Sequence, residues 1–385
     1  MRKYLFRGVV TAVAMAAVTI AVSCADDGND GASGGNGNGG TVKYELSDVV
    51  KVFGFDGQNR YAYCPSVMAT DDMTHMWFCG NPDENVFVDN IYHVTVASDG
   101  TVSAPVSVLQ PGGPGEWDSQ HVCDPSVVRG EFAYGGHTYS YAMFYLGSSL
   151  ECYYNEIGVA FADDPDATEW VKYDRQLVSK TWTGDGDQDL GNGAVSWGVG
   201  QPSAFSVDGR GGIILTYTVG DRDGTRVVWS QCDLSDMSAP SVGAPRKLVT
   251  EGFWNLSGNP DYTRNMDFVY DPVKSTVYAV RPLNPCPASY PSYIGNAIEV
   301  ASITYTNFKN GFGGWARMLR VDSSVTGFPR THNAALERDG YGQLFSDRTL
   351  DVYYTVSKAS PDVEPSDGMH AEWTYDIYRG TMNLE

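Results

Sequence analysis

The sequence predicts an all-β protein built from five repeats of a four-stranded unit. Short segments of one pattern recur along the chain at similar intervals, and each is followed by strands rich in β-branched and aromatic residues. Helical periodicity is absent over any window of useful length. A pair of packed β-sandwiches is the main alternative, but it would not explain five similar strand starts.

The recurring segment has a polar or small residue, then proline or an apolar residue, then a short apolar run. Its five copies are CPSVM at Cys64, DPSVV at Asp124, QPSAF at Gln201, DFVYD at Asp267 and NAALE at Asn333. The intervals between them are 60, 77, 66 and 66 residues. Each copy is predicted to form the first strand of one unit.

A second strand is predicted after each start, and a third strand after the second. The second strands are expected at residues 74–80, 139–147, 212–221, 275–282 and 350–358, and the third at 89–97, 156–162, 225–234, 297–305 and 374–382. Turn signals such as Gly135-Gly136 and Asp208-Gly209 join the first two strands into hairpins.

A fourth, edge-like strand is predicted in the first four units, near residues 106–110, 170–177, 246–249 and 316–321. The fifth unit ends with the chain after three strands, so residues 49–55 are predicted to supply its fourth. Four-stranded units that repeat radially and are closed by the opposite terminus describe a five-bladed β-propeller. We expect this domain to span residues 43–385.

The residues before the repeats have the pattern of export segments. Residues 1–23 have a basic start and then an apolar run shorter than the roughly 20 residues of a membrane span. They resemble a bacterial lipoprotein signal that leads to lipidation of Cys24, although a plain secretory signal is an alternative. Residues 24–42 are polar and glycine-rich, which predicts a flexible tether. Their acidic start resembles the signal of Bacteroidetes-type outer-membrane lipoproteins. The protein is therefore expected to be anchored in the outer membrane, on either its periplasmic or its external face.

The net charge argues against polyanionic partners. The chain carries a formal charge of −21, and loss of the three basic residues of the signal leaves −24. Such a surface repels nucleic acid and anionic lipid headgroups, so contact with a membrane is expected only through the lipid anchor. Six cysteines remain after Cys24 and could pair in an exported protein, and none has the spacing of a zinc site.

The five strand starts are predicted to meet at one place. In a propeller the first strand of each blade lines the central channel, and its first residue points into the funnel at one end. Cys64, Asp124, Gln201, Asp267 and Asn333 should then form a polar ring. Any one of them could simply cap a strand start, whereas five polar groups around a funnel favour a ligand site.

The second and third units resemble known enzymes. The segments DPSVV, YAMFYLG, IGVAFADDPDATEWVKY and GQPSAF, between about residues 61 and 218, are similar to the five-bladed propellers of glycoside hydrolase families 32, 43, 62 and 117. The resemblance implies a carboxylate base or nucleophile at the first strand start, a stabilising aspartate at the second and a glutamate general acid at the third. Asp124 matches the second position, whereas Cys64 and Gln201 replace the other two carboxylates.

The usual chemistry is therefore expected to be lost or relocated, because a glutamine has no proton to give and a thiol is a poor base toward a sugar. Candidates for relocated catalytic carboxylates are Glu116 and Asp118, in the loop that enters the second unit, and Asp267. The alternative for the two loop residues is a solvated surface.

Aromatic and multi-donor side chains near the same end fit sugar recognition, because a pyranose offers an apolar face and several hydroxyls. The residues expected to bind ligand are Cys64, Gln201, Asn333, His121, Trp117, Trp197, Arg264, Asn265 and His332. The only cofactor considered is calcium, at Asp185, Asp187 and Asp189. These have the alternating spacing of a calcium loop, but Leu190 and Ser196 stand where its glycine and glutamate belong.

The sequence thus predicts a carbohydrate-active propeller that acts, like a glycoside hydrolase, on an oligo- or polysaccharide in the central funnel. The alternative is a catalytically inactive, surface-exposed lipoprotein that binds glycan. A scaffold that binds a protein partner is a third possibility. The sequence does not decide between enzyme and binding protein.

Overall fold

The computed structural model describes residues 44–385 except 57, 150–153, 181–196, 222, 290 and 359–370. Cys24, the predicted signal and tether, and the calcium candidates Asp185, Asp187 and Asp189 lie outside the described residues. No helix in the described part is long and apolar enough to cross a membrane. Its helices are short: α1 (Tyr305–Asn310), α2 (Ser323–Thr326) and the 3-10 turn η1 (Ala371–Thr374).

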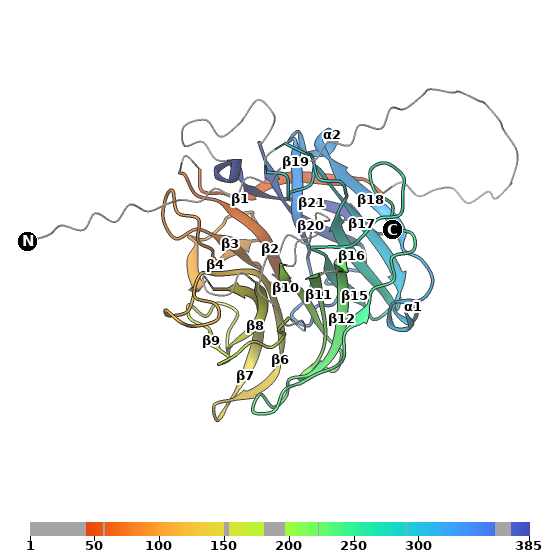
Figure 1. Cartoon of the computed structure of the whole chain (residues 1–385). Coiled ribbons are helices and arrows are strands. Elements are labelled where there is room, and N and C mark those ends of the chain that lie inside the picture. The colour runs from red at the N-terminus through yellow and green to blue at the C-terminus, as the bar shows by residue number, and fades with distance from the viewer. Residues whose placement is uncertain are drawn as a thin grey trace, which may run out of the picture. The chain divides into compact units, whose positions relative to one another are not determined.

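The 21 strands of the described residues form four hydrogen-bonded sheets, and the two halves of the nine-stranded sheet pair only through a parallel contact between Asn155 and Gly198. Divided at that contact, the strands make five groups (Figure 1). Group I has β2 (Ala62–Ala69), β3 (Met73–Gly80), β4 (Asn90–Ala97) and β5 (Val106–Leu109), and group II has β6 (His121–Tyr134), β7 (His137–Ser148), β8 (Asn155–Ala162) and β9 (Val171–Lys172). Group III has β10 (Gly198–Ser206), β11 (Gly212–Asp221) and β12 (Gly224–Asp233), with β13 (Ser241–Val242) and β14 (Arg246–Lys247) paired to β12.

Group IV has β15 (Asp267–Asp271), β16 (Thr276–Pro282), β17 (Ala297–Thr304) and β18 (Ala316–Asp322). Group V has β19 (Arg330–Leu336), β20 (Thr349–Ser357), β21 (Asp376–Asn383) and β1 (Leu46–Phe53). Figure 1 shows β1, the first strand of the described chain, beside the strands of the C-terminal end, and its partner is β21. Neighbouring strands inside each group are antiparallel, as expected for strands joined by hairpins.

Hydrophobic side chains fill the spaces between consecutive groups, which explains why most strands are buried on both faces. Buried clusters join group I to II (Trp77 with Met143), II to III (Phe144 with Leu215), III to IV (Trp229 with Phe268), IV to V (Val300 with Val352), and V to I (Tyr353 with Phe78). Each group therefore packs against two neighbours, and the fifth packs against the first.

The first strands begin with an unusual backbone. At these strand starts, five residues other than glycine have φ between 41° and 52°: Cys64, Asp124, Gln201, Asn265 and Asn333. Four of them stand at a register shift in the pairing with the second strand. We call these five residues the strand-start layer. A residue at such φ costs roughly 1–3 kcal/mol and usually occurs where function requires it.

The structure corrects the predicted register of the fourth unit. Asn265 occupies the strand-start position there, and Asp267 lies two residues further along. Asp267 corresponds instead to Ser66, Ser126 and Ser203, each two residues after its strand start. We call these four residues the arginine layer, because all four contact the buried guanidinium of Arg338.

The turn between β19 and β20 crosses the first strands of the other groups. Carbonyl oxygens of residues 338–342 accept hydrogen bonds from the backbone N–H of Ala69 (2.8 Å), Arg129 (2.5 Å), Ser206 (2.8 Å) and Tyr270 (3.1 Å), one from each of groups I to IV. We call residues 338–344 the closing loop. It covers the end of the first strands that lies away from the strand-start layer.

Candidate functional site

A pocket of about 390 Å³ lies over the strand-start layer. Seven predicted site residues line it: His121, Asp124, Gln201, Arg264, Asn265, His332 and Asn333. Cys64 lies just beneath, in a small cavity of about 20 Å³ that residues of both layers enclose. The strand starts of four groups thus line this pocket, and that of the first group lies in the cavity beneath it.

Asp124 is held at the floor of this pocket with only 7% of its surface exposed. Its local backbone, at φ 48°, follows from its place as the bulged first residue of the DPSVV segment. Burial, with a smaller contribution from the negative charge of Asp89, raises the pKa of Asp124 to about 6, although a hydrogen bond with Cys64 acts in the opposite direction. A carboxyl with this pKa holds its proton in a substantial fraction of molecules near neutral pH.

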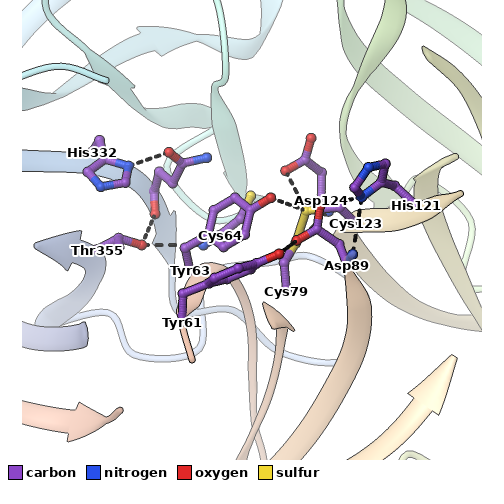
Figure 2. The surroundings of a disulfide bond; sticks show 11 residues. Tyr61, Tyr63, Cys64, Cys79, Asp89, His121, Cys123, Asp124, His332 and Thr355 are labelled. Carbon is purple, nitrogen blue, oxygen red and sulfur yellow. Dashed lines mark hydrogen bonds and ion pairs between the residues drawn. A yellow bond between two sulfur atoms is a disulfide. The ribbon is translucent and has the colours of Figure 1, made fainter. Parts of the chain in front are cut away.

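Asp89 supplies a second carboxylate from the loop that enters β4 (Figure 2). The Tyr61 hydroxyl donates to its Oδ1 at 2.8 Å, and His121 Nδ1 lies 3.0 Å from its Oδ2. The pocket therefore places a largely buried, weakly acidic carboxyl near a carboxylate that is held by hydrogen bonds.

A disulfide between Cys79 and Cys123 joins β3 to β6 directly below Asp124 (Figure 2). It covalently links groups I and II at the pocket floor, and the Tyr63 hydroxyl lies 3.1 Å from Cys123 Sγ. Of the other cysteines that the structure describes, Cys64, Cys232 and Cys286 are free thiols. Burial raises the pKa of Cys64 well above its ordinary value, so this thiol is not a ready nucleophile.

The opposite wall presents polar atoms that the described part of the chain does not satisfy. Gln201 Oε1 and His332 Nε2 are buried and have no hydrogen-bond partner among the described residues. His332 Nδ1 lies 2.5 Å from Asn333 Oδ1, which leaves the other ring nitrogen directed elsewhere. Burial lowers the pKa of His332 to about 4, so the ring is neutral at pH 7. Buried polar atoms without partners are unusual and suit a bound polar ligand.

A second hollow of about 620 Å³ continues from the first and shares Gln201, Arg264 and Tyr293 with it. Trp197, predicted to bind ligand, lines this second hollow. Arg264 is fixed between them, since its Nε donates to Asn284 Oδ1 at 3.2 Å and its Nη1 to the Tyr293 carbonyl at 3.0 Å. Together the two hollows offer room for more than one sugar unit.

Besides Cys64, four predicted site residues lie outside both hollows. Asp118 is buried in an ion pair with Lys172 (2.7 Å) and accepts a hydrogen bond from Tyr145, and Trp117 stacks on the same Tyr145. Glu116 belongs to the same loop but not to the pocket lining. Asp267 faces Arg338 at 3.1 Å, inside the arginine layer. The structure therefore does not bring Glu116, Trp117 and Asp118 to Asp124, whereas Asp267 meets Asp124 only in the small cavity beneath the pocket.

The pocket also contains residues that the sequence analysis did not select. They are Asp89, Glu372, Tyr61, Tyr63, Phe87, Tyr293 and Tyr375. Tyr293 donates to Glu372 Oε1 at 2.7 Å, which fixes a third carboxylate at the rim. Most of these residues stand in loops between strands. The one available signal was the density of tyrosines in RYAYCPS, which leads into the first strand start.

No protein-family model matches the chain, and no curated protein matches it in sequence. Solved structures do match in fold. A family 117 glycoside hydrolase of the marine bacterium Zobellia galactanivorans has a TM-score of 0.57 at 13% identity, over 89% of this chain and 91% of that one. The catalytic domain of a family 62 α-L-arabinofuranosidase of Coprinopsis cinerea has a TM-score of 0.53 at 12% identity, over 89% and 98%.

A family 43 glycoside hydrolase of Xanthomonas citri, solved with xylotriose, has a TM-score of 0.50 at 13% identity, over 88% of this chain and 91% of that one. The chain thus has a nearly all-β fold of the kind found in β-propeller glycoside hydrolases of families 117, 62 and 43. This agrees with the resemblance seen in the sequence. At these identities the likeness concerns the fold, and function has to be argued from the site.

Proposed function

We propose that the five strand groups are the blades of a five-bladed β-propeller, closed by β1, and that the protein cleaves a glycosidic bond in the pocket over the strand-start layer. Hydrophobic clusters between all consecutive groups, including the fifth and the first, support the ring. The closing loop bonds to the other four groups and makes the strand-start end the open one.

The proposal of hydrolysis depends chiefly on one observation, the pairing of Asp124 with Asp89 in a single pocket. Glycosidic cleavage needs a proton donor for the leaving oxygen and a second carboxylate that activates water or attacks the sugar. Two carboxyl groups in different surroundings can divide these roles. Asp124, with its pKa raised to about 6, is suited to donate the proton, and Asp89 is suited to act as the carboxylate.

Recognition of a sugar is supported by the rest of the lining. Phe87, which is 44% exposed, offers an aromatic surface for a pyranose ring, and the buried Tyr61 stacks behind it. Gln201 Oε1 and His332 Nε2 can accept hydrogen bonds from sugar hydroxyls. The second candidate function, binding without cleavage, is favoured by Cys64 and Gln201, which stand where the resembling hydrolases are expected to have carboxylates.

The experiment is release of sugar from a panel of oligosaccharides by the purified protein, beside Asp124→Asn and Asp89→Asn. The panel includes xylotriose, because one matching enzyme was solved in complex with it, and arabinose-substituted oligosaccharides, because another is an arabinofuranosidase. Each variant should lower the release rate about 10²–10⁴-fold, since general acid–base catalysis contributes that much. Binding, measured by calorimetry, should persist in Asp124→Asn.

Asp163→Asn is the matched control, because Asp163 is an exposed aspartate that pairs with His137 away from the pocket. It should retain the parent rate. Binding without any release by the parent would support the glycan-binding alternative. Release that Asp124→Asn does not reduce would place the chemistry elsewhere and overturn the proposal.

A further inference from the structure

A cluster of metal-binding residue types lies away from the pocket, where group I meets the loop after β8 of group II. His75 in β3, His93 in β4 and Asp166 in that loop each place a ligand atom within 4.8 Å of the other two. Trp77 pairs with His93 across the two strands, and His75 lies two residues before Trp77. The two imidazoles are therefore diagonal neighbours on one face of the sheet.

The distances between these atoms fit a single small ion. His75 Nδ1 lies 3.2 Å from His93 Nε2 and 3.4 Å from Asp166 Oδ1. Ligand atoms arranged tetrahedrally around Zn²⁺, with bonds of about 2.0–2.1 Å, are about 3.3 Å from one another. Both measured distances thus match the edge of a zinc tetrahedron.

The surroundings hold the two rings in place and leave an approach from solvent. His75 and His93 are buried, and both stack with Trp77 at ring-centroid distances of 5.8 and 5.0 Å. The Asp166 side chain is 56% exposed, so an ion can enter from that side.

Two hydrogen bonds from the backbone of the loop after β8 to Asp164 fix the turn that carries Asp166. The backbone N–H of Asp166 donates to Asp164 Oδ1 at 2.9 Å, and that of Ala167 donates to the Asp164 carbonyl at 3.1 Å. This tight turn sets the direction of the Asp166 backbone. A metal-bound carboxylate at this point would tie the loop of group II to the sheet of group I.

We propose that His75, His93 and Asp166 bind a divalent transition metal of the Zn²⁺ type, with water as a fourth ligand, and so pin the junction between groups I and II. Two imidazole nitrogens and one carboxylate oxygen suit Zn²⁺, whereas Ca²⁺ and Mg²⁺ take oxygen ligands. None of the three residues lines the pocket, so this site is independent of the proposed glycosidic chemistry. A hydrogen bond between the two imidazoles is the competing explanation of the same distances.

The test is calorimetric titration of the metal-depleted protein with ZnCl₂, and with CaCl₂ for comparison. The parent should bind one equivalent of Zn²⁺ through this cluster, should not bind Ca²⁺ there, and should unfold at a higher temperature with Zn²⁺ than without it. His93→Gln should lose this binding. Asp166→Asn, at an exposed position that keeps the fold, should weaken zinc binding by at least about tenfold.

His137→Gln is the control, because His137 is exposed and forms a lone pair with Asp163 at 2.9 Å in group II. It should bind zinc as the parent does. A parent that binds no zinc would identify the imidazole contact as a hydrogen bond and overturn the proposal. Zinc binding that neither His93→Gln nor Asp166→Asn weakens would place the ion elsewhere and overturn it equally.

Discussion

The strand-start layer and the arginine layer lie two residues apart on the same strands, yet their polar groups are arranged differently. In the arginine layer each side chain accepts a hydrogen bond from the next group: Ser66 from Val127 N, Ser126 from Ala204 N, Ser203 from Phe268 N and Asp267 from Leu336 N. Arg338 then bonds to all four side chains from the middle.

The strand-start layer has the opposite character. Its residues have strained backbones, the carboxyl group of Asp124 has a raised pKa, and Gln201 Oε1 has no partner among the described residues. The residues of both layers are buried or half-buried, so burial alone does not distinguish a site from a structural network. The difference lies in the hydrogen bonds of the layer residues. All four side chains of the arginine layer are hydrogen-bonded and hold the strands together, although Arg338 Nε has no partner among the described residues, whereas Gln201 Oε1 remains available to a ligand.

Arg338→Met should give the largest effect on stability. The substitution leaves the Asp267 carboxylate without its cation and three serines without their shared donor, and breaking a buried pair in this way typically costs about 3–5 kcal/mol. The free energy of unfolding from urea titration measures the loss. Arg348→Met is the control, because Arg348 is 77% exposed and pairs with Glu385 at the surface. Similar losses in the two variants would contradict the structural role of the arginine layer.

Asp124→Asn should change how stability depends on pH. The pKa of Asp124 is about 6 in the folded protein and near 3.8 in the unfolded chain, so ionisation disfavours the folded state. The free energy of unfolding should therefore fall as the pH rises from about 4 to about 6, by roughly 3 kcal/mol from this group. The variant should lack this fall and exceed the parent in stability above pH 6.

The measurement is the difference between the unfolding free energies of parent and variant across that range of pH. Taking the difference cancels the contribution of other buried acids. One of them is Glu337, whose pKa is raised to about 7 by burial in both proteins. A difference that stays constant from pH 4 to 7 would show that Asp124 is not a buried acid with a raised pKa.

The sequence predicted the repeated strand groups because proline and serine mark the first strands of three of them and apolar residues follow. It misplaced the fourth start, because Asn265-Met266-Asp267 lacks the proline that aligns the others. Asp267 was taken for a strand-start carboxylate, whereas it replaces a serine of the arginine layer. The chemical similarity of aspartate to the expected catalytic residue outweighed the alignment with Ser66, Ser126 and Ser203.

The rest of the pocket was harder to predict for a physical reason. Asp89 and Glu372 stand in connections between strands, and no periodicity relates a loop residue to the place where its side chain ends. Glu116 and Asp118 look equally suitable in the sequence, but Lys172 and Tyr145 hold Asp118 outside the pocket. The closing loop gave only the turn signal at Asp339-Gly340, although it contacts all the other groups.

The smallest predicted effect on stability comes from comparing Ser203 of the arginine layer with its neighbour Gln201 of the strand-start layer. Ser203→Ala removes a hydroxyl that donates to Asp267 at 2.6 Å and accepts from Phe268 N at 3.0 Å. It should lower the free energy of unfolding by about 1–3 kcal/mol, because a buried N–H and a carboxylate lose a partner. Gln201→Ala removes a larger side chain, but its Oε1 has no hydrogen-bond partner among the described residues. The free energy of unfolding should therefore change by less than about 0.5 kcal/mol, as is usual for substitutions that disturb neither packing nor a hydrogen-bond network.

Gln201→Ala should instead weaken the binding of whichever oligosaccharide the parent recognises, while Ser203→Ala should leave binding unchanged once the protein is folded. Urea unfolding and calorimetric binding measured on both variants separate the two effects. If Gln201→Ala destabilised the protein more than Ser203→Ala and bound glycan normally, the strand-start layer would be a structural network like the arginine layer, and the pocket would lose its main argument as a binding site.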